Sequence, residues 1–488
     1  MVPKCNNITK FGTIIIVKMN KEIIGRSEEK QKLSDMLISH RSELVAVYGR
    51  RRIGKTYLIR EFFKDKIIFS FTGLCNENKN KQLKNFVLKL NEFSGIKTRD
   101  PNPNDWIDAF NLLKIHLKTI KETKKKKVIF IDEFPWIDSQ KSGFLSAFEN
   151  FWNDYCATRT DLIVVICGSA ASYMVKKIIR NVHGLSKRIT QTIKLMPFTL
   201  QETKAFLHYK GVKMEEYELL KLYMSIGGIA EYLEHIKPGE SAVTTIDRLC
   251  FQPGAYLENE YDDVFKSLFD EHSYHQKIMN ALANNKKEGI TRNELMNELS
   301  IGSSGKFSNS LEDLLQSGFI LKYEAYKNSK KATLYRIFDE FCLFHLQFVQ
   351  KHKGASWTTL FQQQAYITWC GYVFETICLK HIQQLKKALK CDQIASTNYQ
   401  WRNENAQIDL VIDRNDGVVT LCEIKFYNDE LTLDETTLNQ LRKKENEFRV
   451  ATNTRKSIYT CLISTFGANS NQYSNAILSN NVTMKALF

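Results

Sequence analysis

The stretch LVAVYGRRRIGKTYLIREFF, which occupies residues 44–63, restricts the possible folds of this chain more than any other segment. Residues 44–48 are apolar or aromatic and predict a short buried strand. Residues 49–56 match the pattern G-x-x-x-x-G-K-[ST], and the amphipathic residues 56–63 predict the start of a helix. A strand, a glycine-hinged loop and a helix in this order predict an α/β domain with a parallel sheet.

The loop has the composition of a phosphate cradle. Its glycines let the backbone approach phosphate oxygens, and several amide groups converge on them at the start of the helix. The expected nucleotide-binding residues are Gly49, Arg50, Arg51, Arg52, Ile53, Gly54, Lys55 and Thr56. Lys55 is expected to reach the β- and γ-phosphates, and the Thr56 hydroxyl to bind Mg²⁺. The alternative is a glycine turn that opens a basic helix.

An acid at the end of a second strand supports a nucleotide site. Residues 128–131 read Val-Ile-Phe-Ile and predict a strand, and Asp132 lies at its carboxyl end, where ligands bind in open α/β sheets. We expect Asp132 to contribute to the Mg²⁺ shell. Glu133 is placed to orient or deprotonate an attacking water.

Two later residues are weaker candidates for the same site. Residues 162–167 predict a third strand, after which Ser169 either contacts the γ-phosphate or is only a turn serine. Arg188 precedes a further predicted strand and is a candidate arginine finger, acting in cis or, in an oligomer, in trans.

The first part of the chain also resembles a known family. It contains, in order, the segments EIIGRSEEKQKL, YGRRRIGKT, IFIDEFPWI, ICGSAAS, LMPFTLQE and GGIAEYL. As a set, over about residues 22–233, they resemble the archaeal-type ATPase family in the AAA+/STAND branch of P-loop NTPases. The resemblance implies ATP as the nucleotide, residues 24–26 near the adenine, and a helical lid that includes residues 227–233. Ala230 stands where many members have proline, which implies a looser lid turn.

The middle of the chain predicts three short amphipathic helices followed by two strands. The helices are in YHQKIMNALANN, TRNELMNEL and GKFSNSLEDLLQSGFI, and the strands are in LKYEAYKN and ATLYRIFD. This is the plan of a winged helix-turn-helix, whose third helix can lie in a DNA major groove. Lys306, Ser308 and Asn309 are suited to contact DNA, whereas Glu312 and Asp313 repel phosphate. The alternative is a module that docks proteins.

The stretch AQIDLVIDRNDGVVTLCEIKFYN predicts a hairpin near the C-terminus. Residues 408–413 and 418–425 read as strands, joined by a three-residue loop that ends in Gly417. In this register Asp409 lies opposite Glu423, with Cβ atoms ~5 Å apart.

This hairpin predicts a cation site. Two close carboxylates are costly unless a cation binds them, so we expect Mg²⁺ on Asp409, Glu423 and the Ile424 carbonyl oxygen. Lys425 shares a face with Glu423 and is placed to orient a metal-bound water toward a phosphodiester. Glu375 is a further candidate acid from a preceding helix.

Over about residues 371–463 this constellation resembles the PD-(D/E)XK nuclease superfamily, which implies an α/β restriction-endonuclease-like fold. Ile408 stands where proline is frequent. Two alternatives remain open: a nuclease-like domain that binds nucleic acid without cleaving it, and an ordinary solvated strand face.

Length and composition set the frame for these predictions. The 488 residues carry a net charge of +15, which favours a polyanionic partner such as DNA, although a basic surface can be incidental. Eleven scattered cysteines without a Cys-x-x-Cys pair argue against a zinc site or a disulfide framework. No apolar run approaches the ~20 residues of a membrane span, so we expect a cytoplasmic protein.

The predicted organisation has six parts. They are an N-terminal extension (1–18), a P-loop ATPase domain with its lid (19–235), a linker (236–267), a winged helix-like domain (268–340), a helical linker (341–370) and a PD-(D/E)XK nuclease-like domain (371–488).

Three functions fit this organisation. The first is an ATP-hydrolysing enzyme that acts on DNA and carries a possible metal-dependent nuclease. The second is a nucleotide-gated DNA- or protein-binding switch with slow turnover and an inactive nuclease-like domain. The third is an ATPase that docks only proteins. A homo-oligomer is possible in each case.

Overall fold

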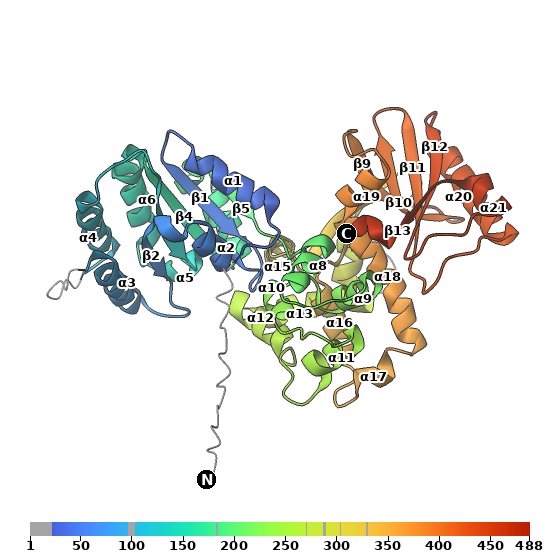
Figure 1. Cartoon of the computed structure of the whole chain (residues 1–488), viewed down its shortest axis with the longest axis horizontal. Coiled ribbons are helices and arrows are strands. Elements are labelled where there is room, and N and C mark those ends of the chain that lie inside the picture. Colours follow the sequence, from blue (N-terminus) through green and yellow to red (C-terminus); the bar gives the residue numbers. More distant parts are fainter. Residues whose placement is uncertain are drawn as a thin grey trace, which may run out of the picture.

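The computed structural model describes residues 22–95, 103–181, 184–269, 271–285, 289–302, 304–327 and 330–488. The predicted N-terminal extension lies outside these residues. Figure 1 shows an N-terminal α/β body in blue and teal, a helical middle in green and yellow, and a C-terminal body with a sheet in orange and red.

The N-terminal body is built on five parallel strands in the order β2-β3-β4-β1-β5. The strands are β1 (Glu43–Tyr48), β2 (Ile67–Thr72), β3 (Lys127–Asp132), β4 (Leu162–Gly168) and β5 (Gln191–Lys194). Alternate residues of β1 enter two separate cores, with Val45 and Val47 in one and Leu44 and Ala46 in the other. Because both faces are covered, β1 and β4 are apolar along nearly their whole length. The three strands predicted from the sequence are confirmed.

Helices cover both faces of this sheet (Figure 1). They are α1 (Ser27–Leu37), α2 (Lys55–Phe62), α3 (Lys79–Ser94), α4 (Trp106–Thr119), α5 (Phe134–Ile137), α6 (Phe144–Asp154) and α7 (Ala171–Tyr173). Aromatic rings dominate the packing of α4 against α6, where Phe110 and Phe151 stack with centroids 4.9 Å apart.

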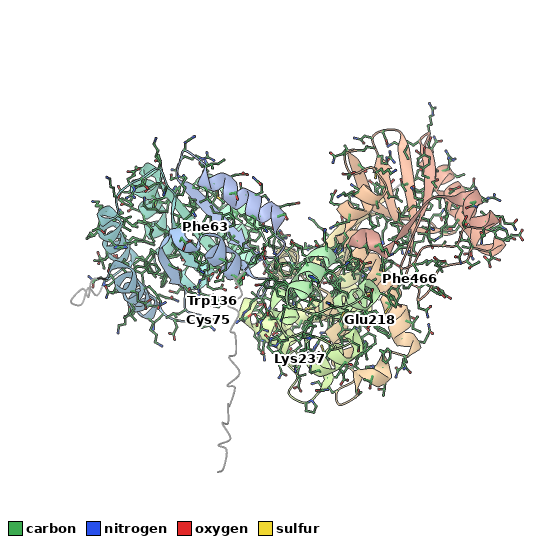
Figure 2. The ribbon with its side chains drawn as sticks, in the orientation of Figure 1. Phe63, Cys75, Trp136, Glu218, Lys237 and Phe466 are labelled. Atoms are coloured by element: carbon green, nitrogen blue, oxygen red, sulfur yellow. The ribbon has the colours of Figure 1, made fainter. Side chains whose placement is uncertain are left out.

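A group of helices follows the sheet and connects it to the rest of the chain. They are α8 (Leu200–Tyr209), α9 (Glu216–Ile226), α10 (Ala230–Glu234), α11 (Ala242–Ile246) and α12 (Glu260–Leu268). The C-terminal body packs directly on this group. The ring of Tyr217 in α9 lies 5.0 Å from Phe466, and Figure 2 shows Phe466 close to Glu218 of the same helix. Helix α9 therefore contacts the C-terminal body.

The three helices and two strands predicted for the middle of the chain are present. They are α13 (His272–Asn284), α14 (Arg292–Glu298), α15 (Gly305–Gln316), β7 (Ile320–Lys327) and β8 (Lys330–Ile337), with a further strand β6 (Ile290–Thr291). β8 pairs antiparallel with both β6 and β7. Together these elements, which we call the α13–β8 module, form three helices against a small sheet.

Two further helices, α16 (Glu340–Phe344) and α17 (Trp357–Leu360), lie in the helical middle (Figure 1). The helices α18 (Gln364–Lys380), α19 (Ile382–Ala388), α20 (Glu435–Thr452) and α21 (Gln472–Ile477) lead into and complete the C-terminal body. The strands are β9 (Ser396–Arg402), β10 (Gln407–Arg414), β11 (Val418–Lys425), β12 (Ser457–Ser464) and β13 (Leu478–Thr483). β9 to β11 are antiparallel, whereas β11 to β13 are parallel.

One sheet joins this body to the α13–β8 module. β7 pairs in parallel with β9, through Ala325 with Gln400 and Tyr326 with Trp401. The result is an eight-stranded mixed sheet in the order β13-β12-β11-β10-β9-β7-β8-β6. Backbone hydrogen bonds therefore cross the interval between the two separately predicted domains, 268–340 and 371–488.

The predicted hairpin register is confirmed. Leu410 pairs with Cys422 and Asp413 with Val419. The loop between the strands has three residues and ends in Gly417, with a φ of 84°. One further step of this register sets Asp409 opposite Glu423.

Two findings concern the described residues as a whole. None of their helices combines the length and apolar character needed to cross a lipid bilayer. Their cysteines are free thiols, and all except Cys75 are buried.

Candidate nucleotide site and C-terminal carboxylate cluster

Residues 49–54, which we call the phosphate loop, connect β1 to α2. Gly49 has a φ of 150°, and a Cβ atom there would lie 2.2 Å from the Leu195 carbonyl oxygen. Gly54 has a φ of 91° at the N-cap of α2. Both positions therefore require glycine. The resulting turn brings the loop to the N-terminus of α2, which carries a partial positive charge.

The first residues of α2 meet the end of β3. Lys55 is buried, and its ammonium donates to the carbonyl oxygens of Gly49 at 3.0 Å and Arg50 at 2.8 Å. Burial lowers the pKa of Lys55. The Thr56 hydroxyl donates to Asp132 Oδ2 at 2.9 Å. An ammonium, a hydroxyl and a carboxylate thus lie at one edge of the sheet.

The neighbouring strand end adds two more groups. Glu133 follows β3 in the left-handed region, with a φ of 46°. Ser169 follows β4 and is buried, and its hydroxyl donates to Glu133 Oε2 at 2.8 Å. Because β3 and β4 are adjacent and parallel, their carboxyl ends meet at the same edge. The structure therefore places Ser169 against Glu133.

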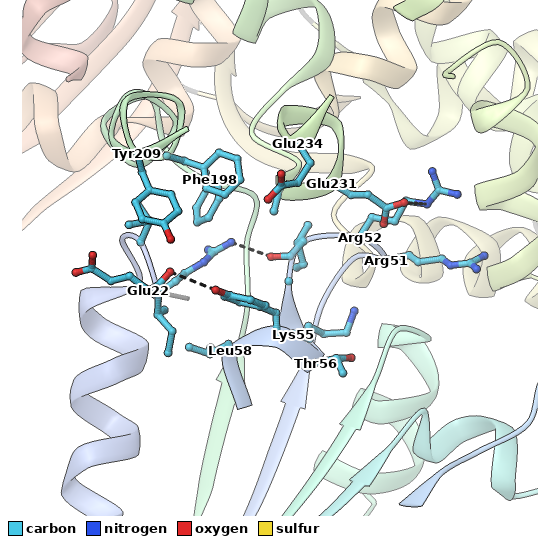
Figure 3. A pocket seen from close by; sticks show the side chains of 18 of the residues that line it. Glu22, Arg51, Arg52, Lys55, Thr56, Leu58, Phe198, Tyr209, Glu231 and Glu234 are labelled. Atoms are coloured by element: carbon cyan, nitrogen blue, oxygen red, sulfur yellow. Dashed lines mark hydrogen bonds and ion pairs between the residues drawn. The ribbon is translucent and has the colours of Figure 1, made fainter. Parts of the chain in front are cut away.

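A cavity of about 660 Å³ opens beside the phosphate loop. Lys55, Thr56 and Glu133 line one part of it. Apolar and aromatic side chains also line the cavity, namely Ile23, Ile24, Phe198, Phe206 and Tyr209. Figure 3 shows Phe198 and Tyr209 across the cavity from Lys55 and Thr56, the first residues of α2. A polar end and an apolar end within one cavity suit a ligand that has a polar or charged part and an apolar part.

Arg26 braces the apolar part of this cavity. Its guanidinium donates to the carbonyl oxygens of Met196 at 2.6 Å and Ile53 at 3.1 Å. It also lies 4.2 Å from the ring centroid of Phe198. Residues 24 and 26, which the resemblance places near an adenine, both line the cavity.

The three arginines of the phosphate loop have different surroundings. Arg50 is buried and forms an ion pair with Asp339. Arg52 lies 2.6 Å from Glu260. The side chains of these two arginines are therefore bound to carboxylates, which leaves their backbone amides for a phosphate. Arg51 and Arg52 both line the cavity. Sequence reasoning missed both carboxylates, because they lie far along the chain.

Arg188 does not lie at the cavity of the same chain. It is exposed, follows a short helical turn at Leu185–Lys187, and is absent from the residues that line the cavity. The role of Arg188 as a finger in trans stays a prediction.

A second cluster forms on the C-terminal hairpin. Asp409 is buried and accepts the Ile424 N–H at 2.8 Å. Lys425 lies 2.8 Å from Glu423, and Lys444 of α20 pairs with the same carboxylate. Burial, followed by the charge of Glu423, raises the pKa of Asp409. Lys444 was not among the predicted residues, and one lysine in a basic helix gives no signal of its own.

Glu375 and Arg336 complete this cluster. Glu375 comes from α18, and burial, followed by the charge of Asp409, raises its pKa. The buried guanidinium of Arg336, from β8, has Nη1 4.0 Å from Glu375 Oε2 and donates through Nη2 to the Tyr372 carbonyl oxygen at 3.1 Å. Buried atoms of both side chains, including Glu375 Oε2, have no hydrogen-bond partner in the structure.

No preformed metal centre exists among the residues that the structure describes. No three side chains of His, Cys, Asp and Glu lie close enough there to hold a metal ion. Both oxygens of the Glu423 carboxylate are paired with lysines, one with Lys425 and the other with Lys444. The proposed ligand pairs, Thr56 with Asp132 and Asp409 with Glu423, stay predictions.

The α13–β8 module contacts the N-terminal body through α15. Asp313 lies 2.6 Å from Lys176, which follows α7, and 3.5 Å from His275. This acid therefore faces the protein, whereas Asn309 is exposed at the start of the same helix. Lys306 is also exposed and pairs with Glu271 at 2.6 Å, an ion pair open to solvent.

Comparisons with known proteins agree with the geometry of the first site. Residues 24–236 match the family described as "ATPase domain predominantly from Archaea", and residues 340–445 match one described as "Archaea bacterial proteins of unknown function". An uncharacterized protein of Methanocaldococcus jannaschii is 26% identical over 83% of this chain and 87% of its own length. An uncharacterized ATP-binding protein of the same organism is 36% identical over 11% of this chain and 88% of its own length.

Two solved structures are also similar. The Walker-type ATPase of Pyrococcus abyssi has a TM-score of 0.47 and 16% identity, over 67% of this chain and 96% of its own. The ORC2 protein of Aeropyrum pernix, in ADPNP–ADP complexes, has a TM-score of 0.42 and 15% identity, over 67% and 93%. The match at residues 24–236 and the site geometry together lead to one conclusion: the chain carries an archaeal-type P-loop ATPase domain, followed by a region of the family of unknown function.

Proposed function

We propose that the chain binds and hydrolyses ATP with Mg²⁺ in the cavity beside the phosphate loop. The observation that carries this proposal is the meeting of groups from three segments at one sheet edge. Thr56 bonds Asp132 at 2.9 Å, and Ser169 bonds Glu133 at 2.8 Å. Ligands of open α/β sheets bind at this edge.

Each group has a role that its surroundings support. Lys55 would bind the β- and γ-phosphates, to which it can turn from the two loop carbonyl oxygens that it now contacts. Glu133 would orient the attacking water and accept its proton. Ser169 would hold the Glu133 carboxylate in the required orientation through its hydroxyl.

The residues present fit Mg²⁺. The hydroxyl of Thr56 and the carboxylate of Asp132 are hard oxygen donors held side by side, as this ion prefers. When bound, Mg²⁺ supplies charge neutralisation between the phosphate groups.

The apolar part of the cavity supports a nucleobase. Phe198, Phe206 and Tyr209 offer ring faces, and Arg26 is fixed against Phe198 at 4.2 Å. No base-specific hydrogen bond follows from these residues, so the choice of adenine rests on the family match to an ATPase.

ATP turnover in Lys55→Ala and Glu133→Gln chains tests the proposal. Lys55→Ala should abolish both binding and turnover. Glu133→Gln keeps an acceptor for Ser169, so it should bind ATP but turn over about a hundredfold more slowly. Lys126→Ala is the matched control, because Lys126 is another buried lysine whose ammonium donates to a backbone carbonyl, at 2.7 Å from Thr160. Native turnover in Lys55→Ala would refute the assignment.

We further propose that DNA is the partner of this ATPase. The net charge of +15 supports a polyanion, and the α13–β8 module has the order of elements of a winged helix. Lys306 and Asn309 are exposed at the start of its third helix, whereas the acid Asp313 is turned toward Lys176. ATP turnover that rises with added duplex would support this partner. Absence of binding even at low salt would favour a protein partner.

A second candidate activity is metal-dependent cleavage of a phosphodiester at the C-terminal cluster. The observation that favours it is that the half-buried Glu375 faces the charge of the buried Asp409. Burial, followed by this charge, raises the pKa of Glu375, and a bound cation would offset the repulsion. Asp409→Asn and Lys425→Ala should each abolish nicking that depends on Mg²⁺. Asp413→Asn on the same hairpin, which pairs with Lys456 away from the cluster, should leave it unchanged. Nicking that survives both changes would refute this activity.

A native chain that does not nick DNA points to the alternative function. If the native chain neither nicks DNA nor turns over ATP repeatedly, it acts as a nucleotide-gated switch with an inactive nuclease-like domain. Nucleotide retained through purification and single-turnover kinetics would identify that case.

A further inference from the structure

Arg50 in the phosphate loop is enclosed by elements from outside the matched ATPase region. Its guanidinium is 3% exposed and pairs with Asp339. Its Nη2 donates to the Tyr232 hydroxyl at 3.3 Å, and its guanidinium carbon lies 5.2 Å from the ring centroid of Phe319. Phe319 precedes β7, and Asp339 follows β8. The end of the α13–β8 module therefore packs directly on a residue that adjoins Gly49.

Asp339 is itself fixed in place. It is 2% exposed and is the N-cap of α16, where its Oδ1 accepts the Cys342 N–H at 2.8 Å while Oδ2 faces Arg50. One carboxylate therefore ties the start of a C-terminal helix to the phosphate loop. A buried guanidinium without this partner would be strongly destabilised, because it would lose its counter-charge in a dry environment.

Arg52 provides a second attachment. It has a φ of 70°, a left-handed conformation that is unfavourable for arginine. Its Nη1 lies 2.6 Å from Glu260 of α12, and its carbonyl oxygen accepts the Glu231 N–H at 3.2 Å. These contacts hold the backbone in a turn that an isolated loop would not favour.

The two attachments form one network. The Tyr232 hydroxyl accepts from Arg50 and donates to Glu260 Oε1 at 2.8 Å. The other oxygen of Glu260 pairs with Arg52. Arg50 and Arg52 flank Arg51, so the loop is held on both sides of Arg51, which lines the cavity together with Arg52.

We propose that Asp339 and Glu260 are positioning residues for nucleotide binding. Their carboxylates hold the phosphate loop, through Arg50 and Arg52, in the shape in which its amides converge on a triphosphate. Both lie outside residues 24–236, so the ATPase domain depends on the C-terminal half for its own binding site. The inference rests on the proposed binding of ATP, and it assigns to that site two residues that touch no phosphate.

Asp339→Asn in the full chain gives the cleanest test. Asparagine is as good an N-cap as aspartate, so α16 keeps its cap while Arg50 loses its counter-charge. Asp434→Asn is the matched control, because Asp434 is also an N-cap in the C-terminal half, at α20, and contacts Thr437 instead of the phosphate loop. Glu260→Gln is a second variant, which keeps an acceptor for Tyr232.

Calorimetry with Mg²⁺-ATP measures the expected effect. Asp339→Asn and Glu260→Gln should each raise the dissociation constant about tenfold or more, equivalent to about 1.4 kcal/mol. The turnover rate at saturating ATP should change much less than KM, because neither carboxylate reaches the reacting atoms. Asp434→Asn should bind like the native chain.

The outcomes distinguish a failure of the proposed ATP binding from a failure of the positioning role of Asp339 and Glu260. If the native chain takes up no ATP, the proposed function fails and this inference fails with it. If the native chain binds and both variants bind equally well, the inference alone is overturned, whatever their melting temperatures. Paired replacement of Arg50 by Gln with Asp339→Asn should recover part of the affinity, because no uncompensated charge is then buried. A merely structural contact would change the melting temperature without this recovery.

Discussion

His381 should make the contact between the C-terminal body and the predicted lid sensitive to pH. Its ring is buried between α18 and α19, where Nδ1 donates to the Ile377 carbonyl oxygen at 2.9 Å. Nε2 accepts the N–H of Leu200, the first residue of α8, at 3.0 Å. Only the neutral ring can accept this bond. Burial accordingly lowers the pKa of His381 to about 4.

The size of the effect follows from the two protonation equilibria. With a pKa of about 4 when the contact is closed and about 6.5 when it is open, protons bind the open state more tightly. The stabilisation is therefore complete above pH 6.5 and is lost as the pH falls toward 4. Between pH 7.5 and pH 5, the opening equilibrium should rise about thirtyfold, or about 2 kcal/mol.

Hydrogen exchange of the Leu200 amide measures this opening directly. After correction for intrinsic exchange rates, its protection factor at pH 5 should be about thirtyfold lower than at pH 7.5. His381→Gln is the control, because glutamine offers an acceptor that does not titrate in this range. Equal falls in the native and Gln chains, or no fall in the native chain, would refute the reasoning.

Three further predictions concern other parts of the chain. Ser169→Ala should lower kcat about tenfold and leave the ATP affinity unchanged, because Glu133 loses the hydroxyl that orients its carboxylate. A change in ATP affinity without a change in kcat, measured by calorimetry and turnover, would contradict this prediction. Gly49→Ala should destabilise the N-terminal body by about 2 kcal/mol or more and abolish ATP binding, because the alanine Cβ would lie 2.2 Å from the Leu195 carbonyl oxygen. Thermal melting measures the stability and calorimetry measures the ATP binding. A native melting temperature and native ATP affinity would contradict this prediction. Lys306→Ala should weaken DNA binding and reduce the slope of log K against log salt by about one; an unchanged slope would exclude a phosphate contact there.

The strand ends of the nucleotide site could be predicted because each carries its own local signal. A buried parallel strand reads as an unbroken apolar run, and the residue that follows it lies at the ligand-binding edge. Asp132, Glu133 and Ser169 were placed at strand ends in this way, and their roles stay predictions. The C-terminal register was equally local, since the three-residue loop that ends in Gly417 dictates which residues oppose each other.

Contacts between distant segments could not be predicted, because no local sequence pattern marks them. β7 joins β9 through backbone hydrogen bonds, and an exposed strand edge has no side-chain pattern that names its partner. The ion pair of Arg50 with Asp339 joins two residues that each look ordinary in sequence, one in a basic loop and the other before a helix. Only the folded chain shows that two basic residues of the loop, Arg50 and Arg52, are attached to distant carboxylates.

The α13–β8 module touches the nucleotide site in two ways, and this makes coupling between ATP and DNA a testable consequence. Asp339, just after β8, holds the phosphate loop, and Asp313 of α15 pairs with Lys176, a few residues after Ser169. If DNA displaces α15, it breaks the ion pair of Asp313 with Lys176, and a movement that extends to the end of β8 also reaches Asp339. Linkage then requires that DNA change ATP affinity by the same factor as ATP changes DNA affinity. Measured with Glu133→Gln to prevent turnover, a common factor of about five or more would support this coupling. A factor of one would show that the two sites act independently, despite their shared contacts.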